Sequence, residues 1–446
     1  MHHAYLAHTD EDRQHMLEAS GYAHIDDLFA PVPEALRHPT INLPAPLSEM
    51  ELQRELGRMA RENTAADDQL CFLGAGAYRH YIPAVLSTLA GRAEFLTAYT
   101  PYQAEVSQGT LQVIYEFQSA LCTLTGMDIA NASTYEGATA AVEAMTMAAR
   151  LTKRKDILIA STVHPEYRQV MRTYADALDM PIHEGDFVGG RARPEQFETV
   201  ESPAALVVQY PNFMGQIEDL QAQADWIHER GGLLVVVMND PVALGLLEAP
   251  GNLGADIVAG EAQAFGNSVS YGGPYLGFLT ARQKYIRQMP GRMSGLAEDA
   301  EGKTAYTLVL QTREQHIRRE KATSNICTNQ GLNALIATIW LSLIGKAGLQ
   351  ELADICFQRA HYLAQKVAAL PRWSLAFEGA FFHEFVLKYD GDLTALLDKL
   401  SHQDCLPGVN LERWYPELSN HLLVTVTEMN TVDDLERLLQ VLEQVS

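Results

Sequence analysis

Residues 99–109 carry the least generic group of polar and aromatic side chains in the sequence. A Thr-Pro turn holds Tyr99 and Tyr102, and the side chains of Gln103, Glu105 and Ser107 follow near the start of an expected helix. Phenolic hydroxyls on a rigid turn can orient a small substrate through hydrogen bonds. Tyrosines also serve in cores and interfaces because they are amphipathic. The stretch therefore predicts either a substrate-orienting site or a packing surface.

Three further residues stand where a phosphate and an aromatic ring could bind. Gly137 and Thr139 begin an expected helix, where free N–H groups can hold a phosphate, although ordinary capping explains them as well. His164 follows a short apolar strand over 157–160, at the sheet edge where ligands gather. Its ring could stack on a ligand there, whereas a plain surface position is the simpler explanation.

Asp240 closes an apolar strand over 233–238 and immediately precedes Pro241. Its carboxylate could face a pyridinium nitrogen, or it could simply begin a turn before the proline. In the order helix-start glycine, loop histidine and strand-end aspartate, these residues match the layout of aminotransferase-like pyridoxal-phosphate (PLP) enzymes.

The lysine that such an enzyme requires is missing. Only an amine can form the internal Schiff base, yet no lysine occurs between Lys155 and Lys284. The expected position falls about where Gln263 and Ala264 stand. Either the scaffold is degenerate or another chain supplies the amine. Use of Lys284 or Lys321 instead is disfavoured, because both lie in segments expected to be helical.

Residues 313–330 are charged at first and then abruptly polar and uncharged. A solvated helix face is the usual meaning of the charged part. The run that includes Thr323 and Asn325 could instead present hydrogen-bond donors to a phosphate or to a neighbouring subunit. The pattern leaves both interpretations open.

The pattern along the chain predicts an α/β fold with three parts. Apolar strands alternate with helices from about residue 100, which is typical of a mainly parallel sheet covered by helices on both faces. A capping box at Ser48–Glu51 begins a helix whose apolar face should pack against something. We expect an N-terminal helical arm over 1–68, a large domain over 69–330, and a small C-terminal α+β domain over 331–446.

Composition excludes several classes of function. The formal net charge is −23, so nucleic acid and a negative membrane surface are unlikely partners. The start of the chain does not resemble a secretion signal, and no apolar run of membrane-spanning length is evident, so a cytoplasmic location is expected. The five cysteines and fifteen histidines show no metal-ligand spacing. No metal site is predicted.

Five separated motifs together resemble one known family. They are residues 99–109, 313–330, 272–278 (Gly-Gly-Pro-Tyr-Leu-Gly-Phe), 414–418 (Trp-Tyr-Pro-Glu-Leu) and the N-terminal stretches 9–13 and 25–29. In this order they look like the alpha subunit of the two-chain P-proteins, the glycine dehydrogenases (decarboxylating) of the glycine cleavage system. The resemblance covers nearly the whole chain. Glu136 departs from it, because an aspartate is expected there.

The resemblance implies a division of labour that accounts for the missing lysine. In such enzymes, of PLP fold type I, the beta subunit carries the lysine and the cofactor, and the alpha subunit is a degenerate relative that completes the site in an α2β2 assembly. Glycine loses CO2 and its aminomethyl group passes to the lipoyl arm of the H-protein. Tyr99 and Tyr102 would then reach into the partner's site, with Gln103, Glu105 and Ser107 as weaker candidates.

Two consequences of the resemblance stay open. Gly137, Thr139, His164, Asp240, Thr323 and Asn325 would form a vestigial cofactor site. A noncatalytic scaffold that stabilises the beta subunit or docks the H-protein is the alternative to a catalytic contribution.

Overall fold

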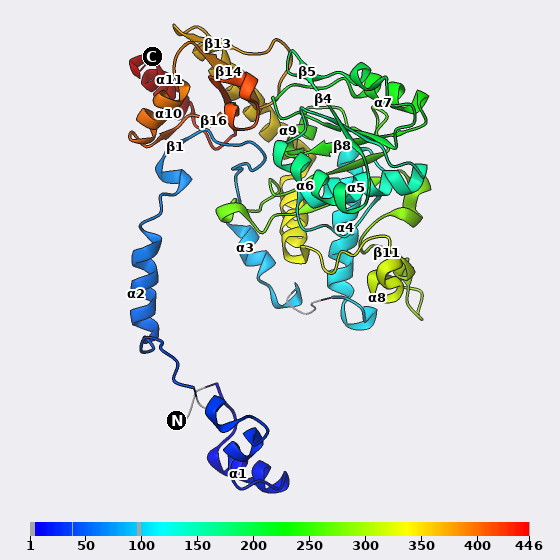
Figure 1. Ribbon diagram of the computed structural model, residues 1–446, viewed down its shortest axis with the longest axis vertical. Helices are drawn as coiled ribbons and strands as arrows, with labels where there is room; N and C mark the ends of the chain where they lie inside the picture. Colours follow the sequence, from blue (N-terminus) through cyan, green and yellow to red (C-terminus); the bar gives the residue numbers. More distant parts are fainter. Residues whose placement is uncertain (1–4, 38, 96–99, 446) are drawn as a thin grey trace. The chain divides into compact units, whose positions relative to one another are not determined.

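The computed structural model describes residues 5–37, 39–95 and 100–445, and the chain forms two compact units, residues 1–64 and 65–446 (Figure 1). The first unit contains α1 (Asp10–Ala19) and α2 (Glu49–Ala60). The predicted capping box is present, because Ser48 Oγ accepts the N–H of Glu51 while the Glu51 carboxylate accepts the N–H of Ser48. None of the described residues up to residue 64 is buried. The apolar face of α2 is therefore left exposed within this unit.

A seven-stranded sheet forms the centre of the second unit. Its order is β2 (Ile129–Ala130), β10 (Gly277–Ala281), β9 (Ile257–Glu261), β8 (Leu233–Met238), β7 (Ala205–Gln209), β3 (Ile157–Ala160) and β4 (Ile182–Gly185). The strands from β9 to β4 are parallel, and β10 runs antiparallel to both of its neighbours. The inner strands are buried along almost their whole length, as runs of Val, Ile and Leu require when both faces of a sheet are covered. The mainly parallel α/β architecture is confirmed.

Among the described residues from 65 to 330, five α-helices and one short helical turn accompany the sheet. They are α3 (Val85–Ala90), α4 (Gln108–Thr125), α5 (Gly137–Thr152), α6 (Pro165–Ala177), α7 (Leu220–Glu229) and the short α8 (Gln315–Arg318). Gly126 ends α4 in the left-handed conformation with φ of 67°, which a residue without Cβ adopts easily. Helix α5 packs across β8, β9 and β10 and against α6, so its first turn lies beside the ends of the central strands. Two hairpins, β5 (Phe187–Val188) with β6 (Arg191–Ala192) and β11 (Ser294–Glu298) with β12 (Thr304–Leu308), complete this part.

Helix α9 (Gly331–Ala368) joins two hydrophobic cores of the second unit. Its first part packs against α3 and α4, and the helix is interrupted at Gly345, where φ is 63°. Among the described residues, α9 is long and apolar enough to cross a membrane by length and composition. Side chains such as Trp340 and Cys356 are nevertheless fully buried in the core around the seven-stranded sheet. These contacts place part of α9 in a hydrophobic core.

The C-terminal lobe is an antiparallel sheet covered by helices. Its strands, in order, are β13 (Trp373–Leu375), β14 (Glu384–Tyr389), β17 (His421–Thr425) and β16 (Val409–Asn410), and its helices are α10 (Leu393–Ser401) and α11 (Val432–Val445). The short strand β1 (Leu70–Cys71) pairs with β15 (Cys405–Leu406), and Phe72 is buried in the core of this lobe. The chain therefore leaves the C-terminal lobe at about residue 73 and then crosses to the large sheet.

Candidate functional site

The predicted histidine, aspartate and helix start do lie at the ends of parallel strands. His164 follows β3, Asp240 follows β8, and Gln263 follows β9, where the missing lysine was expected. The carboxyl ends of parallel strands meet at one edge of a sheet, which is where ligands bind in such folds. Each of these side chains is nevertheless already bonded to other parts of this chain.

His164 is covered by residues 75–80, the crossing segment, which runs from the C-terminal lobe to the large sheet. Its Nε2 lies 2.8 Å from the carbonyl oxygen of Ala75, and its Nδ1 accepts the N–H of Glu166. Burial lowers the pKa of His164, so the ring is neutral with its proton on Nε2. Gly76 has φ of +106°, and a Cβ at that position would lie 2.6 Å from His164 Nε2. The backbone of this segment thus occupies the space against the ring.

Asp240 is paired with His80 from the same segment. His80 Nε2 lies 3.0 Å from Asp240 Oδ2, and His80 Nδ1 lies 2.8 Å from Glu428 Oε2. Burial disfavours charge on both partners, but the two carboxylates raise the pKa of His80 well above its usual value, and His80 lowers the pKa of Asp240. The other Asp240 oxygen accepts the N–H of Val242, so the turn expected before Pro241 is also present.

The first backbone N–H groups of α5 are occupied by carboxylates. Glu136 accepts hydrogen bonds from the N–H groups of Ala138 and Thr139, and Glu261 accepts one from Gly137 at 2.9 Å. Glu261 also accepts the backbone N–H groups of Gln263 and Leu276. Burial raises the pKa of Glu261 from 4.5 to about 7, although these hydrogen bonds lower it in part. The helix start therefore binds two side chains of its own protein where a phosphate would otherwise bind.

Gln263 closes the position of the missing lysine. Its Oε1 accepts the N–H of Tyr78, and its Nε2 donates to the carbonyl oxygens of Tyr78 and Asn267. A buried amide with its donors and acceptor engaged is a structural group. With Ala75, Tyr78 and His80 all bonded across it, this edge of the sheet does not fit PLP.

The exposed Tyr102 borders a separate pocket of about 360 Å³. Its lining residues are Thr100, Tyr102, Arg292, Glu314, Gln315, His316, Ile326 and Cys327. Arg292 Nη2 donates to the Tyr102 hydroxyl at 3.2 Å and to the carbonyl oxygen of Cys327 at 2.6 Å. The Tyr102 ring meets the His316 ring edge-on, with centroids 5.4 Å apart. These contacts hold the phenol in one orientation at the pocket wall.

The pocket presents charges of both signs. Burial raises the pKa of Glu314, while Arg313, Arg292 and His316 lower it in part. Arg292 is a permanent cation that can also pair with a carboxylate. A guanidinium and a carboxyl on the walls of one pocket suit a small zwitterion such as an α-amino acid.

The other predicted residues lie in two segments, 103–107 and 323–325. Gln103 and Glu105 are exposed, and Ser107 is buried immediately before α4. Thr323 is half-buried and Asn325 is exposed, in a segment that continues directly to Ile326 and Cys327 of the pocket. This segment thus belongs with Tyr102 rather than with His164 and Asp240. Tyr99 lies outside the described residues.

Sequence reasoning missed several polar residues with defined contacts. Arg292, Glu314 and His316 are ordinary charged residues in the sequence, and only the fold brings them to Tyr102. His80 and Glu428 are separated by more than three hundred residues, so no spacing could pair them with each other or with Asp240. A charged residue at the end of an otherwise apolar strand, as Glu261 is, was the one feature of the sequence that could have indicated such a contact.

Comparison with known proteins agrees with this geometry. The family model described as glycine cleavage system P-protein matches residues 3–442. The probable glycine dehydrogenase (decarboxylating) subunit 1 of Desulfitobacterium hafniense is 49% identical over 440 residues, which is 97% of this chain and 98% of that protein. The protein of the same name from Moorella thermoacetica is 47% identical, over 97% and 98% of the two chains.

Solved structures lead to the same family. An inhibitor-bound crystal structure of glycine decarboxylase (P-protein) of the glycine cleavage system aligns with a TM-score of 0.92 and 41% identity over 100% of both chains. Lactobacillus brevis glutamate decarboxylase, at 14% identity, a TM-score of 0.68 and coverage of 93% and 96%, shares the fold alone. The predicted PLP fold type I is therefore confirmed. By its sequence over nearly its full length and by its structure, the chain belongs to the glycine cleavage system P-protein family.

Proposed function

We propose that this chain is the non-lysine subunit of a two-chain glycine decarboxylase and completes the active site of a second subunit that holds PLP. The observation that carries the proposal is the edge of the sheet where the cofactor would bind. There Gln263 stands in place of the lysine, and the chain's own residues 75–80 bond to His164 and Asp240. PLP supplies the capacity to stabilise the electron pair that decarboxylation leaves behind, and the partner provides it.

In the proposed reaction glycine loses its carboxylate as CO2, and the aminomethyl group passes to the lipoyl arm of an H-protein. The pocket beside Tyr102 is the part of this chain that would face these reactants. Arg292 would attract the glycine carboxylate, and the fixed Tyr102 hydroxyl would limit its orientation. Such positioning removes orientational freedom before reaction and so lowers the barrier. We expect the working assembly to contain two copies of each subunit and to reside in the cytoplasm.

Replacement of Arg292 tests this role most directly. In the complex with the lysine-bearing subunit, Arg292→Met should raise the KM for glycine at least tenfold, because a charge-assisted hydrogen bond contributes about 1.5–3 kcal/mol. Arg287→Met, at an exposed arginine outside the pocket, is the matched control and should leave KM unchanged. An unchanged KM for Arg292→Met would remove the pocket from substrate binding.

A scaffold without a catalytic role is the second candidate, and the exposed first unit favours it. Large apolar side chains of that unit, among them Leu36, Ile41, Leu43 and Leu56, are more than half exposed, as a surface meant for a partner would be. Replacing Tyr99 and Tyr102 together by alanine separates the two functions. A scaffold would keep full turnover, whereas a subunit that completes the site would lose most of it while still assembling.

A further inference from the structure

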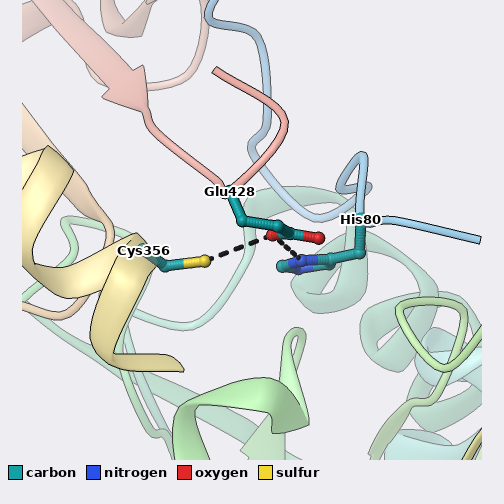
Figure 2. Close-up of side chains that lie close together, drawn as sticks. All are labelled: His80, Cys356 and Glu428. Carbon is teal, nitrogen blue, oxygen red and sulfur yellow. Dashed lines mark hydrogen bonds and ion pairs between the residues drawn. The ribbon is translucent and has the colours of Figure 1, made fainter. Parts of the chain in front are cut away.

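Three side chains from distant parts of the sequence converge in the interior of the second unit (Figure 2). His80 lies in the crossing segment, Cys356 on α9, and Glu428 in the loop between β17 and α11. Glu428 Oε2 lies 2.8 Å from His80 Nδ1 and 3.3 Å from Cys356 Sγ. One potential ligand atom from each residue lies within 4.8 Å of the other two. No part of this cluster belongs to the pocket beside Tyr102.

The donor set selects a particular class of metal ion. Imidazole nitrogen, thiolate sulfur and carboxylate oxygen together suit Zn²⁺ and related transition-metal ions, whereas Mg²⁺ and Ca²⁺ prefer oxygen alone. Zinc sites with three protein ligands, one open position and tetrahedral geometry are common. In this cluster a water molecule or the second oxygen of Glu428 would complete the coordination.

The spacing of the ligand atoms is close to that of a zinc site. Tetrahedral bonds of about 2.1 Å to nitrogen and oxygen place those two atoms about 3.4 Å apart, and a bond of about 2.3 Å to sulfur places sulfur and oxygen about 3.6 Å apart. Here the corresponding separations are 2.8 Å and 3.3 Å. Shifts on the order of half an ångström, within reach of side-chain rotation, would admit the ion.

A second layer of hydrogen bonds already orients two of the ligands. Asp240 Oδ2 lies 3.0 Å from His80 Nε2, and the N–H of Tyr81 donates to Glu428 Oε1 at 2.6 Å. A histidine that donates its other ring N–H to a carboxylate is the usual arrangement around bound zinc. Asp240 therefore fixes the ring with Nδ1 directed toward Cys356 and Glu428.

Exchange of protons for the ion leaves the buried charge unchanged. Without an ion, the proton on His80 Nδ1 and the proton of the Cys356 thiol form the hydrogen bonds to Glu428. A divalent ion that binds the neutral imidazole, the thiolate and the carboxylate displaces these two protons into solvent. Two positive charges leave as two enter, so the site gains no uncompensated charge, which would be costly in the interior.

We propose that His80, Cys356 and Glu428 bind one Zn²⁺ ion, with Asp240 as the residue that orients His80. The ion joins the crossing segment, α9 and the C-terminal lobe, and so holds residues 75–80 across the ends of the central strands. The ion takes no part in the proposed decarboxylation reaction.

Metal titration of the full-length chain tests the proposal. Co²⁺ added to metal-free protein should bind one ion per chain and give the near-ultraviolet absorption of a cobalt–thiolate bond. Cys356→Ser should abolish this absorption, and Cys71→Ser, at another buried cysteine outside the cluster, should preserve it. Asp240→Asn should weaken Zn²⁺ binding about 10- to 100-fold, as loss of an orienting partner does.

X-ray absorption of the zinc-loaded wild-type chain keeps the test decisive if a variant fails to fold. One sulfur and two or three nitrogen or oxygen neighbours at bonding distance would support the site. Failure of the wild-type chain to bind Co²⁺ or Zn²⁺ stoichiometrically would overturn it. Binding without a sulfur neighbour, or cobalt–thiolate absorption that survives Cys356→Ser, would overturn it equally.

Discussion

Tyr102 is the side chain for which we propose a direct role on a reactant. Its hydroxyl accepts a hydrogen bond from Arg292, and half of the residue is exposed at the pocket. Tyr102→Phe should lower turnover of the assembled enzyme about tenfold, which corresponds to loss of about 1.4 kcal/mol from a charge-assisted hydrogen bond. Steady-state exchange assays and co-purification measure turnover and assembly separately. Tyr174→Phe, on the exposed surface of α6, should change neither, and normal turnover of Tyr102→Phe would exclude the hydroxyl from the mechanism.

Glu261 gives the fold a pH dependence. Burial raises its pKa to about 7 from the ordinary 4.5, so between these values the folded chain retains a proton that the unfolded chain has lost. Its contribution to the free energy of unfolding is complete below about pH 4.5, falls as the pH rises to 7, and stays constant above. In denaturant titrations at several pH values, the free energy of unfolding of Glu261→Gln should therefore rise by about 3 kcal/mol relative to that of wild type between pH 4.5 and pH 8. A difference that does not vary with pH would contradict this.

The sequence predicted that His164 and Asp240 lie at strand ends, but it did not predict the residues that they contact. His164 and Asp240 follow apolar strands, so their place at the sheet edge could be predicted from the alternation of strands and helices. Their hydrogen-bond partners Ala75 and His80 lie in an irregular segment whose path depends on tertiary contacts. Periodicity carries no information about such a segment.

At the scale of elements, the crossing segment depends on close contact between backbone and side chain. Gly76→Ala should lower the free energy of unfolding by about 2–4 kcal/mol for two reasons. The new Cβ would clash with His164, and residue 76 has a positive φ that alanine adopts only at a cost. Gly272 is a matched control with φ of +100° and no atom within 4 Å of a built Cβ, so Gly272→Ala should cost only about 1–2 kcal/mol. Equal losses in thermal or denaturant unfolding would show that the segment is not packed tightly against His164.

The same segment predicts that restoring the lysine is insufficient. In Gln263→Lys, His80 still pairs with Asp240 and Ala75 still covers His164, so the variant incubated with PLP should acquire no visible absorbance from protein-bound cofactor. The lysine-bearing subunit serves as the positive control. Stoichiometric visible absorbance in the variant would mean that the sheet edge is open to the cofactor after all.

Regular elements were largely predictable, and irregular ones were not. Strands β3 and β8 coincide with the predicted apolar runs, because complete burial demands continuous Val, Ile and Leu. The charged segment after residue 313 was expected to be one helix face, yet α8 covers only Gln315–Arg318. Strand β10 reverses direction within the sheet, which depends on pairing with distant β2 and β9 rather than on local pattern.

The whole molecule has the fold of a PLP enzyme, but residues 75–80 of the same chain bond to the side chains at the edge of its central sheet. The compact second unit contains the hydrophobic cores, and the first unit exposes apolar side chains that none of its own described residues covers. Together with the pocket beside Tyr102, this arrangement supports our proposal that the chemistry takes place on a partner subunit. The two predicted domain limits within residues 65–446 remain predictions, and α9 contributes to cores on both sides of the second limit.

Reconstitution with the lysine-bearing subunit tests this account most directly. The chain should be incubated with PLP alone, the partner alone, and both together, followed by measurement of bound PLP and of exchange between glycine and labelled bicarbonate. We predict neither bound PLP nor exchange for this chain alone, and both when the subunits are combined. Bound PLP and exchange in the single chain would contradict the division of the active site between two subunits.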